Sequence, residues 1–116
     1  MGISEIESSL MKKEEKLDKV MIKSREIVRL CSNAIKAIHS KEFDAAKKLL
    51  KEADSEVSAI KKFEDEFPGH VNHIMQEYVE ARIVFSAVED GKIPSFKDLD
   101  APMEAYLTGL LDATGE

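Results

Sequence analysis

Residues 20–39 read VMIKSREIVRLCSNAIKAIH, and this stretch decides the fold class of the chain. Its apolar side chains recur every three or four residues, which is the spacing of one face of an α-helix. Neither proline nor glycine interrupts the sequence from Ile3 to His39. We therefore expect one long helix over residues 3–39. A helix of this length exceeds the usual globular helix of about 8–20 residues, which favours packing against partner helices and self-association.

The rest of the chain divides into further helical segments at a few clear breaks. Pro68 and Gly69 end the second segment, because proline disfavours helical geometry in the residue before it. Gly91 suits a left-handed cap after the third segment, and Pro102 suits the first turn of the fourth. The predicted helices are therefore residues 3–39, 43–65, 71–89 and 102–115. They form a single all-α domain over residues 1–116, an antiparallel bundle of about four helices with a long first helix.

Composition limits the function classes that remain open. No run of about 20 apolar residues and no N-terminal signal is present, so we expect a soluble cytoplasmic protein that has no membrane partner. Cys31 is the single cysteine and falls on the apolar stripe of the first helix, which predicts a core position. The net charge of −6 argues against a general nucleic-acid coat. Residues 1–50 carry +3 and residues 51–116 carry −9, so basic and acidic surfaces can face different partners.

Two glutamates stand out on the third predicted helix. Glu77 and Glu80 are three residues apart and share a face, and Ile83 and Val84 follow Glu80 one turn later. A carboxylate among apolar side chains is costly unless a cation or a hydrogen bond compensates it. A bound Mg²⁺ or Mn²⁺ would compensate both acids. Alternatively, both glutamates are simply solvated on the helix surface. We expect the polar stripe that begins at Arg82 on the same helix to be solvated as well.

The fourth predicted helix carries a matching pair of acids. Its large apolar residues lie on one side, and the opposite side is small and then acidic, with Gly109, Asp112 and Glu116. Glycine inside a helix costs about 1 kcal/mol relative to alanine, which indicates the close approach of another helix or a ligand. The two acidic pairs can converge on one metal site, as in other helical bundles, although spacing alone does not prove it.

Residues 76–81 (QEYVEA) and 105–116 (AYLTGLLDATGE) together resemble the translin family. The similarity is closer to translin-associated factor X (TRAX) and its archaeal relatives. It extends over about residues 20–116, with weaker support from the first helix. The resemblance implies the N-terminal part of a seven-helix fold that assembles into an octamer around single-stranded RNA or DNA. The family's subunits are longer, so the chain is expected to be C-terminally truncated or an unusually short member.

The resemblance also implies an activity. Factor X-like subunits resemble Mg²⁺-dependent endoribonucleases whose catalytic carboxylates match Glu77, Glu80, Asp112 and Glu116. Of these, the first three are the expected metal ligands, and Glu116 is the fourth expected catalytic carboxylate. Translin itself lacks acids at the third-helix positions, so this chain is similar to the catalytic type.

Substrate contacts are less defined by the sequence. Arg25, Arg29 and Lys36 lie on one side of the first helix and form a candidate phosphate-binding stripe. His70 and His73 precede the glutamates on the third helix and are further candidates. The basic stripe can also be an ordinary solvated surface. The two histidines can likewise be ordinary surface or core residues.

Two rival interpretations remain open. The chain can be a non-catalytic helical module that binds nucleic acid or oligomerises. A di-iron bundle is weaker, because it requires Glu-x-x-His motifs and the histidines here precede the glutamates.

Overall fold

The computed structural model describes residues 2–115, and these residues form helices without any strand. The all-α fold and the long first helix are therefore confirmed. The elements are α1 (Ile3–His39), α2 (Phe43–Ile60), the 3₁₀ turn η1 (Lys61–Phe63), α3 (Pro68–Glu89) and α4 (Met103–Thr114). Within the described residues, no helix is both long enough and apolar enough to cross a membrane.

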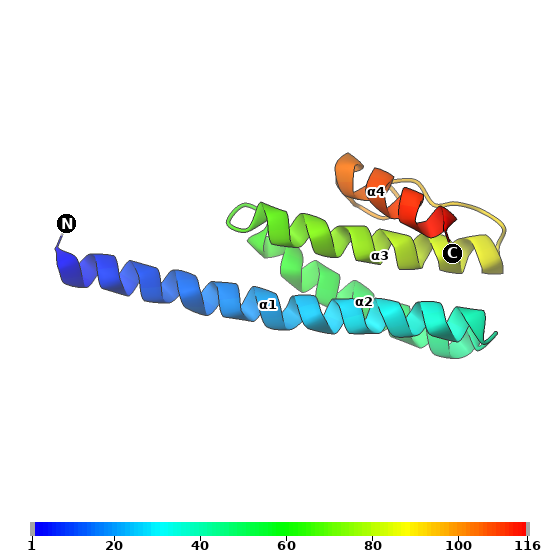
Figure 1. Ribbon diagram of the computed structural model, residues 1–116, viewed down its shortest axis with the longest axis horizontal. Coiled ribbons are helices and arrows are strands. Elements are labelled where there is room, and N and C mark those ends of the chain that lie inside the picture. The colour runs from blue at the N-terminus through cyan, green and yellow to red at the C-terminus, as the bar shows by residue number, and fades with distance from the viewer. Residues whose placement is uncertain (1, 116) are drawn as a thin grey trace.

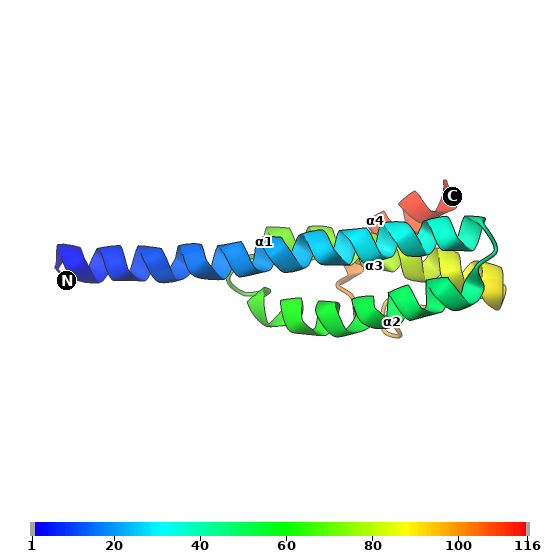
Figure 2. The same cartoon turned by 90° about the horizontal axis from the view of Figure 1, so that it is seen from below.

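The helices lie alongside one another with α3 in a central position (Figure 1). α1 and α2 run antiparallel, α2 and α3 do the same, and α3 packs on both of them. α4 packs on α3 and runs in the same direction, because residues 90–102 carry the chain back along the bundle. The N-terminal part of α1 projects beyond the other helices in both views (Figures 1 and 2), and the molecule is 59 Å long.

The core forms where α1, α2 and α3 meet. Burying a large aliphatic or methionine side chain stabilises the fold by roughly 1.5–3 kcal/mol relative to leaving it exposed. The large side chains that are fully buried come from all three helices: Val20, Ile27, Leu30, Leu50, Ile60, Val71, Met75 and Val79. Cys31 is 2% exposed, which confirms its predicted core position.

Helix ends differ from the prediction at four places, one of them the end of α4 at Thr114 rather than residue 115. α2 ends at Ile60 rather than residue 65, because the chain tightens into η1 before Phe67 enters the core. α3 begins at Pro68 rather than residue 71, since proline suits the first helical position. Pro102 is the N-cap of α4 rather than part of its first turn. Gly91 has a φ of +69°, as expected for the left-handed end of α3.

The helical spacing of apolar residues also predicts Leu10 and Phe43 on the packed sides of the first two helices, and neither is buried. Leu10 is 58% exposed because the projecting part of α1 has no neighbouring helix, and Val20 is the first buried residue of α1. Phe43 is 38% exposed because it begins α2 just after the turn, at the end of the bundle. The core therefore covers only the second part of α1.

Candidate functional site

Gly109 sets the position of α4 on α3. A Cβ at this residue would lie 2.7 Å from Cγ1 of Val79 and 2.8 Å from the backbone oxygen of Gln76. The close approach that we predicted at Gly109 is thus a helix–helix contact. The contact touches α3 beside both candidate glutamates, since Gln76 precedes Glu77 and Val79 precedes Glu80.

Glu77 and Glu80 lie half-buried on α3. Both are close enough to Cys31 of α1 to act on its thiol. Burial is the largest cause that raises the pKa of Cys31 to about 12, and the negative charge of Glu77 is the next, with a smaller contribution from Glu80. The two carboxylates therefore share the side of α3 near Cys31, next to the α4 contact.

Asp112 follows Gly109 by three residues and is exposed on α4. Because α3 and α4 run in parallel, Asp112 lies further along the bundle than the Gly109 contact, on the side towards Glu80. Even so, among residues 2–115 no three His, Cys, Asp or Glu side chains form a group that could hold a metal ion. Glu116, the fourth predicted acid, lies outside the described residues.

A polar cluster that the sequence did not predict joins α2 to α3. The Tyr78 hydroxyl donates a 2.5 Å hydrogen bond to Oδ1 of Asp54, and Arg82 forms an ion pair with the same carboxylate. Burial first, and then the hydrogen bond to Asp54, raise the pKa of Tyr78 to about 12. Burial alone would lower the pKa of Arg82, but its contacts with Asp54 and Tyr78 raise it. The expected solvated stripe at Arg82 is therefore wrong, because its partner lies on another helix.

A groove between α1 and α3 brings together most of the predicted nucleic-acid contacts. It has a volume of about 390 Å³, within the range of roughly 300–1,000 Å³ that is common for ligand pockets. Four exposed basic side chains line it: Arg25, Arg29, His70 and His73. Lys36, the fifth candidate, is exposed near the end of α1 and does not line the groove.

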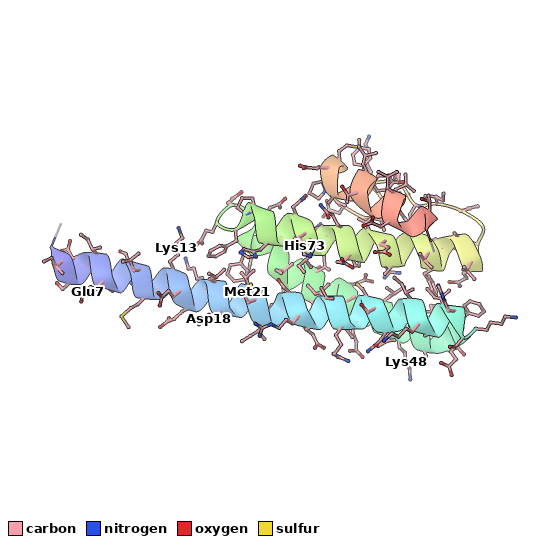
Figure 3. The ribbon with its side chains drawn as sticks, viewed as in Figure 1. Glu7, Lys13, Asp18, Met21, Lys48 and His73 are labelled. Atoms are coloured by element: carbon pink, nitrogen blue, oxygen red, sulfur yellow. The ribbon has the colours of Figure 1, made fainter. Side chains whose placement is uncertain are left out.

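The floor of the groove is apolar apart from one hydroxyl. Met21, Val28 and Ile74 line it together with Ser24. Figure 3 labels Met21 on α1 and His73 on α3, which border the groove from its two sides. Ser24 is 9% exposed, and its Oγ is the one buried side-chain N or O atom within residues 2–115 that has no hydrogen-bond partner. Leaving such a group unpaired costs about 1–3 kcal/mol.

The basic rim is partly neutralised. Arg29 forms a 2.7 Å ion pair with Glu26 on the same helix. The hydrogen bond to Arg29 is the main cause that lowers the pKa of Glu26. Both side chains are substantially exposed, and exposed ion pairs contribute little to stability. Arg29 can therefore exchange this partner for a ligand anion at little cost.

The two glutamates follow the groove residue His73 along α3. His73, Glu77 and Glu80 fall on one side of this helix at spacings of four and three residues. With a rise of about 1.5 Å per residue, Glu77 lies about 6 Å beyond His73 along the axis. A chain molecule that occupies the groove would extend past both carboxylates if it followed α3.

No protein-family model matches this chain. An uncharacterised protein of Methanocaldococcus jannaschii is 36% identical over 111 residues, which are 92% of this chain and 50% of that protein. The chain thus spans about half the length of this curated relative.

The solved structures include one strong match, the crystal structure of apo-NeC3PO. It superposes with a TM-score of 0.90 over 98% of this chain and 63% of that chain, at 22% sequence identity. C3PO is a complex of translin and TRAX, so the chain has a translin-like fold. This likeness extends through the projecting part of α1 and through α4, since nearly the whole chain is covered.

Proposed function

We propose that this chain is a translin-like protein that binds single-stranded RNA or DNA. The observation that supports this most is the match to apo-NeC3PO over 98% of the chain. The motifs of residues 76–81 and 105–116 support it independently. The groove with Arg25, Arg29, His70 and His73 supplies basic side chains for phosphate contacts.

We further propose that the chain is the TRAX-like, catalytic type of subunit and cleaves single-stranded RNA with the help of Mg²⁺ or Mn²⁺. Glu77 and Glu80 suit such an ion, because Mg²⁺ is commonly bound by one or two carboxylates and completes its shell with water and substrate phosphate. Asp112 would add a carboxylate from α4. Within residues 2–115 no three such side chains form a metal-binding group, and in this proposal water and the substrate phosphate complete the shell of the ion.

In this mechanism the protein positions the acids and the substrate. The helical spacing of Glu77 and Glu80 holds both carboxylates on one side of α3, and the Gly109 contact fixes the helix that carries Asp112. The metal, when bound, supplies an activated water for in-line attack and charge neutralisation at the phosphorus oxygens. The basic groove holds the strand beside the carboxylates, which provides the proximity that the attack requires.

The cleavage test uses end-labelled single-stranded RNA with Mg²⁺ and then with a chelator. We expect cleavage only with the metal, and we expect Glu80→Gln to abolish it while RNA binding persists. Glu104→Gln removes an exposed charge from the first turn of α4 and serves as the matched control, with cleavage unchanged. Full cleavage by the Glu80→Gln variant would contradict the role of this residue.

The alternative is a non-catalytic module that binds nucleic acid or oligomerises. The absence of a three-ligand group within residues 2–115 favours it. Thermal melting with added Mg²⁺ or Mn²⁺ separates the two functions, because a ligand that binds only the folded state raises the melting temperature. Indifference to both ions, together with intact RNA binding, would support the non-catalytic module.

A further inference from the structure

The groove between α1 and α3 combines features that suit one kind of ligand. Its floor presents apolar side chains from both helices, and its rim carries Arg25, Arg29 and two histidines. His70 lies in the first turn of α3, where the helix end carries partial positive charge. A ligand that fits has an apolar face for the floor and a negative charge for the rim.

Ser24 adds a separate indication of a ligand. This residue is 9% exposed and lines the groove, and its hydroxyl has no hydrogen-bond partner within the described residues. Buried hydroxyl groups are normally hydrogen-bonded. The ligand therefore also offers a donor or an acceptor on the part that enters the groove.

We propose that the groove is a nucleotide subsite, in which one unstacked base of a single strand lies on the apolar floor. Ser24 Oγ hydrogen-bonds the edge of this base, and Arg25, Arg29 and His73 contact the adjacent phosphates. The subsite rests on the proposed binding of single-stranded nucleic acid and states which part of the strand the groove takes. A nucleotide satisfies all three requirements, since its base has two apolar faces and polar edges and its phosphate is anionic.

The direction of the groove supports a nucleotide over an acidic peptide. His73 is followed on the same side of α3 by Glu77 and Glu80, so a strand leaving the groove along α3 reaches the two carboxylates. These acids repel any anion unless a divalent cation is shared with it. A nucleotide strand can share such a cation and also supplies a base for the apolar floor, which a run of acidic side chains does not.

The test measures binding of a fluorescent oligothymidylate of about 15 nucleotides by anisotropy at low salt of about 50 mM. We expect Ser24→Ala to weaken binding by about 3- to 10-fold, the usual effect of one hydrogen bond. The stability of this variant should not fall, since the hydroxyl has no hydrogen-bond partner within residues 2–115. Arg25→Ala should weaken binding and reduce the salt slope by about 1. Lys48→Ala removes the same charge from an exposed position on α2, far from the groove (Figure 3). It should change neither the affinity nor the salt slope.

An oligonucleotide without bases separates the two parts of the subsite. If the base occupies the floor, this probe binds more weakly, and Ser24→Ala no longer affects its affinity. Equal affinity for the two probes would overturn the base position, and so would equal affinity for duplex DNA. Polyglutamate that displaces the oligonucleotide as well as unlabelled oligothymidylate does would overturn the nucleotide assignment.

The remaining outcomes distinguish this subsite from the proposed function. If the wild-type chain binds no single strand, the proposed function fails and the subsite fails with it. If the wild type binds, and Ser24→Ala and Arg25→Ala bind the oligonucleotide as tightly as Lys48→Ala does, the proposed function stands and the subsite is wrong.

Discussion

At residue 109 the space between α3 and α4 leaves no room for a side chain. The nearest atoms to a Cβ there belong to Val79 and to the backbone of Gln76. A backbone atom cannot move aside as the end of a flexible side chain can, so the two helices have to separate. The same separation would move Asp112 away from the carboxylates of α3.

The first prediction concerns this contact. Gly109→Ala should lower the free energy of unfolding, because overpacking of about 1–3 kcal/mol exceeds the helix-propensity gain of about 1 kcal/mol. Gly69→Ala is the matched control, since a Cβ at Gly69 meets nothing within 4 Å. This control should be neutral or more stable by up to about 1 kcal/mol. Urea denaturation measures both, and equal effects of the two substitutions would contradict the contact.

The second prediction concerns alkaline pH. Burial, with smaller effects from neighbouring groups, raises the pKa of both Cys31 and Tyr78 to about 12, from ordinary values of 9.0 and 10.0. Well below pH 9 both groups are protonated in the folded and unfolded states, so their contribution to stability is constant. As the pH rises from 9 towards 12 the unfolded chain loses these protons first, and the free energy of unfolding falls.

Urea denaturation at several pH values from 8 to 11.5 checks this dependence. Cys31→Ala should flatten the fall from about pH 9 upwards, and Tyr78→Phe should flatten it only from about pH 10 upwards, because each removes one of the titrating groups. A fall that is equally steep in both variants and in the wild type would show that other groups cause it.

At the scale of elements, the polar cluster at Asp54 fastens α2 to α3. Tyr78 and Arg82 are one turn apart on α3, and both contact the same carboxylate of α2. The Arg82 side chain is 22% exposed, so its charge is largely removed from water. An ion pair in this environment matters most when one partner is lost.

The third prediction concerns the loss of one partner of this ion pair. Asp54→Ala leaves the half-buried Arg82 charge and the Tyr78 hydroxyl without their acceptor, and should lower the free energy of unfolding by about 1–3 kcal/mol. Glu66→Ala removes one partner of the exposed pair with Lys16, which joins α1 to the loop before α3, and should cost no more than about 1 kcal/mol. Denaturation curves that show the same small effect for both variants would argue against a structural role for the cluster.

The sequence predicts elements better than contacts between them. The uninterrupted stretch before His39 predicts both ends of α1, and glycine at 91 predicts the end of α3, because these signals are local. The partner of Arg82 could not be predicted, since Asp54 lies 28 residues away. For the same reason, Arg25 and His73 were separate candidates until the packing of α1 on α3 placed both at one groove.

The faces of α4 show the same limit. The sequence separates a large apolar side from a small side, and Gly109 on the small side leaves open whether another helix or a ligand approaches it. In the structure the small side is buried, at Ala105 and Gly109, and the larger residues Met103, Leu107 and Leu111 are exposed. Close backbone approach to α3 is possible only for small residues, and this selects the buried side. The sequence predicts the candidate carboxylates as two pairs on two helices. The distance between the pairs depends on how closely α4 approaches α3.

At the scale of the whole molecule, the N-terminal part of α1 projects beyond the other described helices (Figures 1 and 2). Ile3, Ile6 and Leu10 recur at helical spacing on this segment and are 77%, 44% and 58% exposed. Together with the exposed residues of α4, they give the molecule two apolar helix surfaces. Apolar surfaces of this kind commonly mark protein–protein contacts.

The last prediction is that the α1 surface mediates self-association. The wild-type chain should sediment with a mass above the 13.0 kDa of one subunit. Leu10→Glu should reduce this mass, because a charge in the contact is costly to bury. Ser8→Glu introduces the same charge on the opposite side of the projecting helix and serves as the control, with association unchanged. Neither substitution touches the core, so circular dichroism should show equal helix content. A 13.0 kDa wild-type species at every concentration would contradict self-association, and equal loss in both variants would place the contact elsewhere on the molecule.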